Sequence, residues 1–194
     1  NYAQWNISPG SSFKPYDYVS LINDTTNTGA GSVLYDVQQP LPGYPCTDKS
    51  LPAPKGTGNC LEDYDFRYPG AEAIRYALAG SRNVPAVKAM LTVGTDKVIK
   101  TADAMMAAPN AYQCYGNTDL TVTAPCYGSS AIGDGAYLHL DQHVNGLSTL
   151  ARMGNAIPTT YILQITDSAN KTLYKWTQPK GTQVVRPDAA YIIN

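Results

Sequence analysis

Several kinds of residue are scarce in this 194-residue chain, and each shortage excludes a class of protein. Charged residues make up only 15% of it and the formal net charge is -1, so no basic stripe for nucleic acid or cationic helix for a membrane surface is expected. The sequence contains no run of 18 apolar residues and no signal-peptide pattern, so no segment is predicted to cross a bilayer. A chain of this length can bury one sizeable core, and one domain is therefore expected.

Histidine is also scarce, with two residues in the chain. His139 and His143 stand four apart on a predicted helix, a spacing that can bind zinc. The Glu of a His-Glu-x-x-His motif and an obvious third ligand are both missing. We therefore predict a surface helix, no metal site and no cofactor.

The four cysteines fall into two local pairs, each inside a stretch rich in Pro, Gly or Asn. Neither pair has the close Cys-x-x-Cys spacing of zinc and redox sites. Two loop-closing disulfides, Cys46–Cys60 and Cys114–Cys126, are the favoured interpretation, and they would place the chain in an oxidising, extracytoplasmic compartment. The alternative is four reduced, buried cysteines in a cytosolic protein.

The hydrophobic pattern predicts helices followed by strands, with no alternation of single strands and helices. Near the end of the chain, two strands are expected to be joined by a turn at 168–170. Residues 25–70 are expected to be loop-rich, with a short strand near 32–37. This order favours an α+β fold over a doubly wound sheet. The expected helices are 11–23, 71–80, 84–94, 95–108 with Thr95 as N-cap, and 138–154; the expected strands are 159–167 and 171–176.

The stretch PGSSFKP at 9–15 places a serine and a lysine three residues apart at the start of a helix. Ser11 and Lys14 would share one helix face, and a desolvated lysine with a lowered pKa can activate a serine hydroxyl. The simpler interpretation is a turn followed by an ordinary helix start. The spacing alone decides little, because SANK at 168–171 has it too.

A second polar group follows in GSRNVPAVKAM at 80–90. Ser81 and Asn83 fall in the break between two predicted helices, so both side chains could face a cleft. A hydroxyl there could relay a proton, and an amide could hold a substrate amide. Ser81 could also be a helix cap, which is a common role of serine at such breaks.

These two segments resemble the first and second active-site motifs of penicillin-binding proteins, and most closely those of the bifunctional, class A kind. The flanking DKVIKTADAM, HLDQHVNGLSTLARMGNAIPTTYILQITD and VVRPDAAYIIN also follow that family's course, so the similarity covers nearly the whole chain. The resemblance implies a penicillin-binding/serine β-lactamase-like transpeptidase fold. The chain would supply its helical part and the first strands of its C-terminal antiparallel sheet.

The resemblance also implies roles for four side chains. Ser11 would be the acylated nucleophile and Lys14 its general base, while Ser81 would pass a proton to the leaving group and Asn83 would hold the substrate amide. The implied activity is a D-Ala-D-Ala transpeptidase that cross-links peptidoglycan stem peptides and is inhibited covalently by β-lactams. The implied location is the extracytoplasmic face of a bacterial membrane, and nucleic acid is not a partner.

The third motif of this family, Lys-Thr-Gly or Lys-Ser-Gly, is absent from the sequence. KGTG at 55–58 and KGT at 180–182 have the wrong form and order. Residues 1–194 are therefore expected to be a partial transpeptidase domain, a piece of a longer protein that is inactive without its missing C-terminal part. A non-catalytic or penicillin-sensing domain of the same fold, and a β-lactamase, remain as alternatives.

Overall fold

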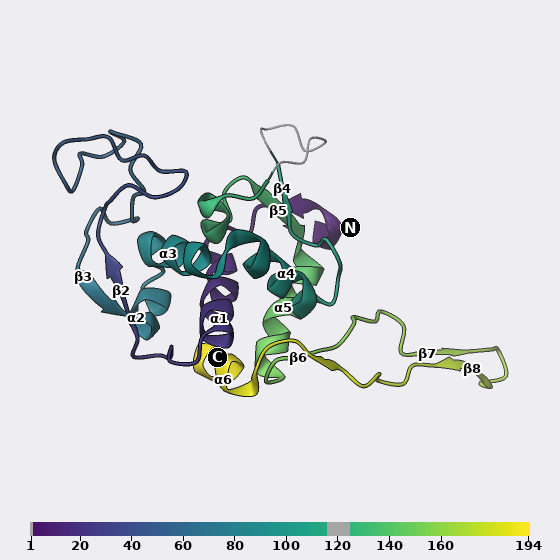
Figure 1. Cartoon of the computed structure of the whole chain (residues 1–194). Coiled ribbons are helices and arrows are strands. Elements are labelled where there is room, and N and C mark those ends of the chain that lie inside the picture. The colour runs from purple at the N-terminus through teal and green to yellow at the C-terminus, as the bar shows by residue number, and fades with distance from the viewer. Residues whose placement is uncertain (1, 116–124) are drawn as a thin grey trace.

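The computed structural model describes residues 2–115 and 125–194, which form a helical body with small antiparallel sheets at its edges (Figure 1). The six α-helices of the described part are α1 (Lys14–Asp24), α2 (Ile74–Ala79), α3 (Asn83–Val93), α4 (Thr95–Met106), α5 (Leu140–Ala151) and α6 (Pro187–Ile193). Three short 3-10 helices are η1 (Tyr2–Gln4), η2 (Gly10–Phe13) and η3 (Gly128–Ile132).

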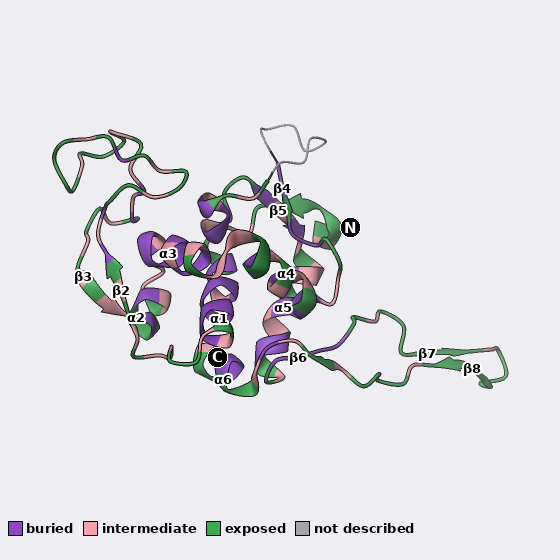
Figure 2. Cartoon of the chain, viewed as in Figure 1, coloured by how far each residue is buried: buried purple, intermediate pink, exposed green. Residues whose placement is uncertain are grey.

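Helix α1 lies in the middle of the body and is buried along most of its length (Figure 2). It contacts α3, α4 and α6. Tyr16, Val19 and Ile22 are fully buried, in line with a helix that is enclosed rather than lying on the surface. This burial also removes the polar residues Lys14 and Asp17 from water.

The described strands pair only antiparallel, which confirms the predicted α+β class. One sheet has the order β1-β5-β4, and the others are the pairs β2-β3, β6-β9 and β7-β8. The bounds are β1 (Asn6–Ile7), β2 (Val33–Asp36), β3 (Gly70–Ala73), β4 (Gln113–Cys114), β5 (Ala136–His139), β6 (Asn155–Ala156), β7 (Gln164–Thr166), β8 (Thr172–Lys175) and β9 (Thr182–Gln183).

The expected strands 159–167 and 171–176 meet in the hairpin β7-β8, which extends away from the body (Figure 1). Every residue of β7 and β8 is exposed (Figure 2). No helix in the part of the chain that the structure describes is long and apolar enough to cross a membrane.

Two predicted helices begin later than expected, because their first residues form strands. Residues 70–73 pair with β2 in the register Val33↔Ala73, and residues 136–139 pair with both β1 and β4. These strand partners outweigh the local helix preference of Ala- and Leu-containing segments. Thr95 is the first residue of α4 and not its N-cap, a position that Gly94 takes.

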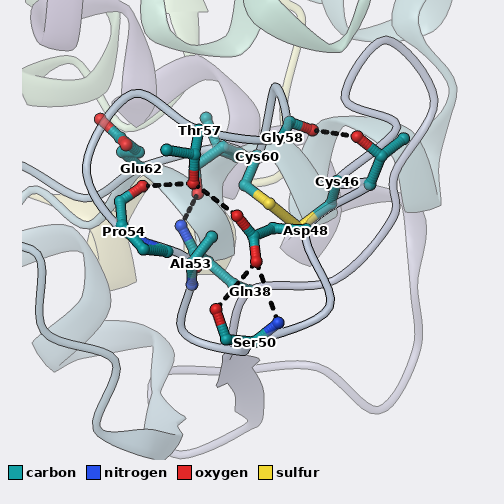
Figure 3. Close-up of a disulfide and its surroundings, with 12 residues drawn as sticks. Gln38, Cys46, Asp48, Ser50, Ala53, Pro54, Thr57, Gly58, Cys60 and Glu62 are labelled. Atoms are coloured by element: carbon teal, nitrogen blue, oxygen red, sulfur yellow. Dashed lines mark hydrogen bonds between the residues drawn. A yellow bond between two sulfur atoms is a disulfide. The ribbon is translucent and has the colours of Figure 1, made fainter.

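Both predicted disulfides are present. Cys46 and Cys60 are joined at an S–S distance of 2.02 Å, and Cys114 and Cys126 are joined at 1.97 Å. Figure 3 shows the first bond beside Asp48, whose carboxylate accepts hydrogen bonds from the hydroxyls of Ser50 and Thr57. The bridge and these side-chain bonds order a loop that has little regular structure.

Candidate active site

Ser11 lies on η2, which runs directly into α1. The turn before it is held from η3, where Ser8 Oγ donates a hydrogen bond to the carbonyl of Gly133 over 2.5 Å. A Cβ on Gly133 would lie 2.3 Å from the Gly10 nitrogen, so only glycine permits this close approach. The turn is therefore fixed, while the Ser11 side chain is left exposed.

Lys14 connects the first motif to the second. Its side chain is buried, with 1% exposure, and Nζ donates to the Ser81 carbonyl at 2.5 Å and to Asn83 Oδ1 at 2.7 Å. A third contact reaches Ser81 Oγ at 3.2 Å. Among the described residues these three acceptors hold the amine, and Ser11 precedes it on η2 without a direct hydrogen bond. A hydrogen bond between a candidate nucleophile and its candidate base often tightens only when substrate is bound.

Burial lowers the pKa of Lys14 to about 8. The carboxylates of Asp63 and Asp17 oppose this shift, and the Arg82 guanidinium adds to it. The ammonium is disfavoured because it has lost its hydration. An amine with this pKa can accept a proton near neutral pH, which an ordinary lysine seldom does.

Ser81 takes a left-handed backbone conformation with φ of +52°, which is strained for a residue other than glycine. Its N–H donates to the Leu78 carbonyl at 2.9 Å, and its carbonyl and hydroxyl both face Lys14. The N-cap of α3 is Arg82 and has no side-chain cap bond. Helix capping therefore does not account for Ser81.

Arg82 anchors the second motif to the loop-rich segment, a role that the motif alone did not reveal. Its buried guanidinium pairs with Asp36 at 2.6 Å, with Asp65 at 2.8 Å and with Asp63 at 3.5 Å. Asp63 also accepts the backbone N–H of Asn83. The acidic stretch at 62–65 was the available sequence signal, but nothing in its spacing indicated which cation it would meet.

The Asn83 side chain is oriented from both ends. Its Oδ1 accepts from Lys14, and its Nδ2 donates to the Glu62 carbonyl at 2.7 Å. Burial next to Asp36 raises the pKa of Asp63, which holds the Asn83 backbone, to about 7. The structure thus brings Lys14, Ser81 and Asn83 together at the start of α3, one helical turn from Ser11.

The prediction of a surface helix is wrong for His143, which is buried on α5. Its Nε2 lies 2.9 Å from Ser12 Oγ, and its Nδ1 lies 3.2 Å from the Tyr16 hydroxyl. No cluster of three or more metal-ligating side chains occurs within residues 2–115 and 125–194. Sequence reasoning missed this contact because Ser12 and His143 are 131 positions apart.

No family model matches the chain. One curated relative, penicillin-binding protein 1A/1B of Bacillus subtilis strain 168, is 33% identical over 107 residues, which are 54% of this chain and 10% of the relative.

Solved structures match over the whole chain. Penicillin-binding protein A from M. tuberculosis, solved as an imipenem acyl-enzyme complex, superposes with a TM-score of 0.74 at 19% identity over 100% of this chain and 43% of its own. PonA1 from the same species gives 0.76 at 17% identity over 99% and 47%. Penicillin-binding protein 1A from Haemophilus influenzae gives 0.72 at 19% identity over 100% and 30%.

The chain therefore has the fold of penicillin-binding-protein transpeptidase domains, and the predicted resemblance is confirmed. It spans less than half the length of these solved chains and aligns with a tenth of the curated relative.

Proposed function

We propose that this chain is part of a D-Ala-D-Ala transpeptidase that forms an acyl-enzyme on Ser11. The observation that carries the proposal is the environment of Lys14. A buried amine with a lowered pKa is held by a serine and an asparagine from a second motif, one turn after an exposed serine. A lysine in a structural ion pair keeps a high pKa, whereas burial at this site lowers the pKa of Lys14 to about 8 and so raises the share of neutral amine near neutral pH.

In the proposed reaction, Ser11 Oγ attacks the carbonyl between the two D-alanines of a stem peptide while neutral Lys14 takes its proton. Ser81 Oγ, 3.2 Å from Nζ, passes a proton to the leaving amine as the peptide bond breaks and D-alanine departs. An amine from a second strand then attacks the ester and frees Ser11. A β-lactam would follow the first half of this path, but its opened ring stays attached.

The Ser11 backbone N–H would supply one oxyanion-hole donor. The missing third motif would supply the other, and loss of one such donor costs about 100- to 1000-fold in rate. We therefore propose that a further segment carrying that motif completes the site. The two disulfides support an extracytoplasmic location for the whole protein.

Intact-mass spectrometry with excess penicillin, on the longest polypeptide that contains this chain, tests the proposal. We expect one adduct, mapped to the peptide with Ser11 and lost in Ser11→Ala. Ser168→Ala is the matched control, because Ser168 stands in the other Ser-x-x-Lys segment and its substitution should leave the adduct unchanged.

No adduct in the complete polypeptide would contradict acylation. Rapid release of hydrolysed penicillin would favour a β-lactamase. An adduct without stem-peptide turnover would favour a penicillin sensor.

A further inference from the structure

Beside the candidate nucleophile, three side chains form a hydrogen-bonded chain that the proposed reaction does not use. Ser12 follows Ser11 on η2, His143 comes from α5 and Tyr16 comes from α1. Ser12 Oγ contacts both the Pro9 carbonyl at 2.6 Å and His143 Nε2 at 2.9 Å. The turn that carries Ser11 is therefore tied to a helix more than 120 residues further along the chain.

Counting the hydrogens on each group shows which group donates in these hydrogen bonds. A hydroxyl has one hydrogen, and the 2.6 Å distance to Pro9 is that of an O–H···O bond, so Ser12 donates to Pro9. His143 Nε2–H must then donate to Ser12 Oγ, and the neutral ring carries no hydrogen on Nδ1. The Tyr16 hydroxyl lies 3.2 Å from Nδ1 and 3.2 Å from the His143 carbonyl, so its one hydrogen is shared between these two acceptors. Tyr16 is buried, which raises its pKa and keeps its proton, and burial lowers the pKa of His143, which favours the neutral ring.

Helix α5 is shaped to accept this arrangement. Gly146 lies one turn after His143, and a Cβ there would lie 2.2 Å from the Tyr16 hydroxyl and 2.9 Å from Met106 Cγ. Any larger residue would displace Tyr16 from His143. The Tyr16 ring also packs against Phe13 of η2, with ring centroids 5.0 Å apart, and this contact further restrains the tyrosine.

We propose that His143 is a positioning residue for Ser11, which it holds in place through the Ser12 hydroxyl. Ser11 is exposed and lies on a short 3-10 turn, so the position of its hydroxyl depends on how firmly the backbone of that turn is held. The Ser12–His143 bond ties the turn to α5, in addition to the Gly133 contact with Ser8. This inference rests on the proposed function, since Ser11 must be the nucleophile for its position to matter.

The test is the acylation of Ser11 by penicillin in the complete polypeptide, with the rate constant of acylation measured separately from the binding constant. His143→Leu removes the donor and is expected to slow acylation about two- to ten-fold, the value of one hydrogen bond, with little change in binding. His143→Gln keeps an N–H donor at a similar reach and should restore most of the rate. His139→Leu, at the last residue of β5 and directly before the same helix, is the matched control and should acylate at the wild-type rate.

Ser12→Ala removes the same hydrogen bond from its other partner. Ser12 is exposed, so misfolding is not expected. The variant should slow acylation as His143→Leu does, and the double variant should be no slower than either single one. Wild-type rates in His143→Leu and Ser12→Ala, or equal losses in the Leu and Gln variants, would overturn the inference. Persistence of the adduct in Ser11→Ala would instead overturn the proposed function, so the two failures are distinguishable.

Discussion

Lys14 is the residue whose charge state decides whether the site can act. Its pKa is lowered from 10.5 to about 8, so at pH 7 the neutral fraction rises from roughly one in three thousand to roughly one in ten. Because only the neutral amine can take a proton from Ser11, we expect the acylation rate of the complete polypeptide to rise with pH and to level off above about pH 8. The measurement is penicillin acylation by rapid quench from pH 6 to pH 10.

Lys14→Arg is the control for that profile, because a guanidinium stays charged at every pH used and should abolish acylation. A profile that is flat, or whose midpoint lies near that of an ordinary lysine, would contradict a base role for Lys14.

Burial of the Asp17 carboxyl group lowers the stability of the folded protein. Asp17 is fully buried one turn after Lys14, and neither carboxylate oxygen has a hydrogen-bond partner among the residues that the structure describes. Burial raises its pKa well above 3.8. A raised folded-state pKa means that the folded protein loses stability as pH rises above the unfolded value. We expect Asp17→Asn to increase the free energy of unfolding at pH 7 by about 1 to 3 kcal/mol, with the gain fading as pH falls toward 4.

Urea unfolding at several pH values measures this effect. Asp24→Asn is the matched control on the same helix, because Asp24 already pairs with Lys97 at 2.8 Å and its loss should not stabilise the protein. An Asp17→Asn gain that persisted unchanged at pH 4 would show that the ionised carboxylate is not its source.

At the scale of elements, the start of α3 depends on Arg82. Its guanidinium is the shared partner of three acidic residues, and Asp36 and Asp63 are both buried. Removal of one member of a buried ionic group leaves the others unpaired, at a cost of about 3 to 5 kcal/mol. Arg82→Met should therefore lower the free energy of unfolding by that amount and should slow acylation as well, because Ser81 and Asn83 flank it.

Denaturant unfolding and penicillin acylation, measured on the same samples, check both parts of this prediction. Arg75→Met on α2 is the matched control, because Arg75 is exposed and its guanidinium stacks on the Tyr76 ring. A stable Arg82→Met variant would show that the acidic side chains are satisfied by other groups.

At the scale of the whole molecule, local sequence patterns predicted those parts of the site whose residues lie close together in the sequence. Ser11 and Lys14 lie within one turn, and Ser81 and Asn83 lie two residues apart where α3 begins, so their spacing was informative. The contacts that orient them were not predictable, because they come from an aperiodic loop at 62–65 and from His143 on a distant helix. The strands β3 and β5 were missed for the same reason, since distant partners determine them.

The hairpin β7-β8 gives the last prediction at this scale. It is exposed on both faces, with Leu163, Ile165 and Leu173 among its exposed apolar side chains. An isolated two-stranded hairpin is at best marginally stable in water, and an apolar surface of this kind marks a place where protein packs. Since the chain spans less than half of its solved structural relatives, we propose that a further segment of the same protein covers the hairpin.

Hydrogen exchange on residues 1–194 and on the longer polypeptide tests this proposal. We expect the backbone amides of β7 and β8 to exchange rapidly in the shorter chain and slowly in the longer one, because covering strands would pair and dehydrate them. The amides of α1, which are buried by this chain alone, should be protected in both samples and serve as the internal reference. Equal, fast exchange of the hairpin in both would mean that its apolar side chains serve another surface and that the segment completing the site packs elsewhere.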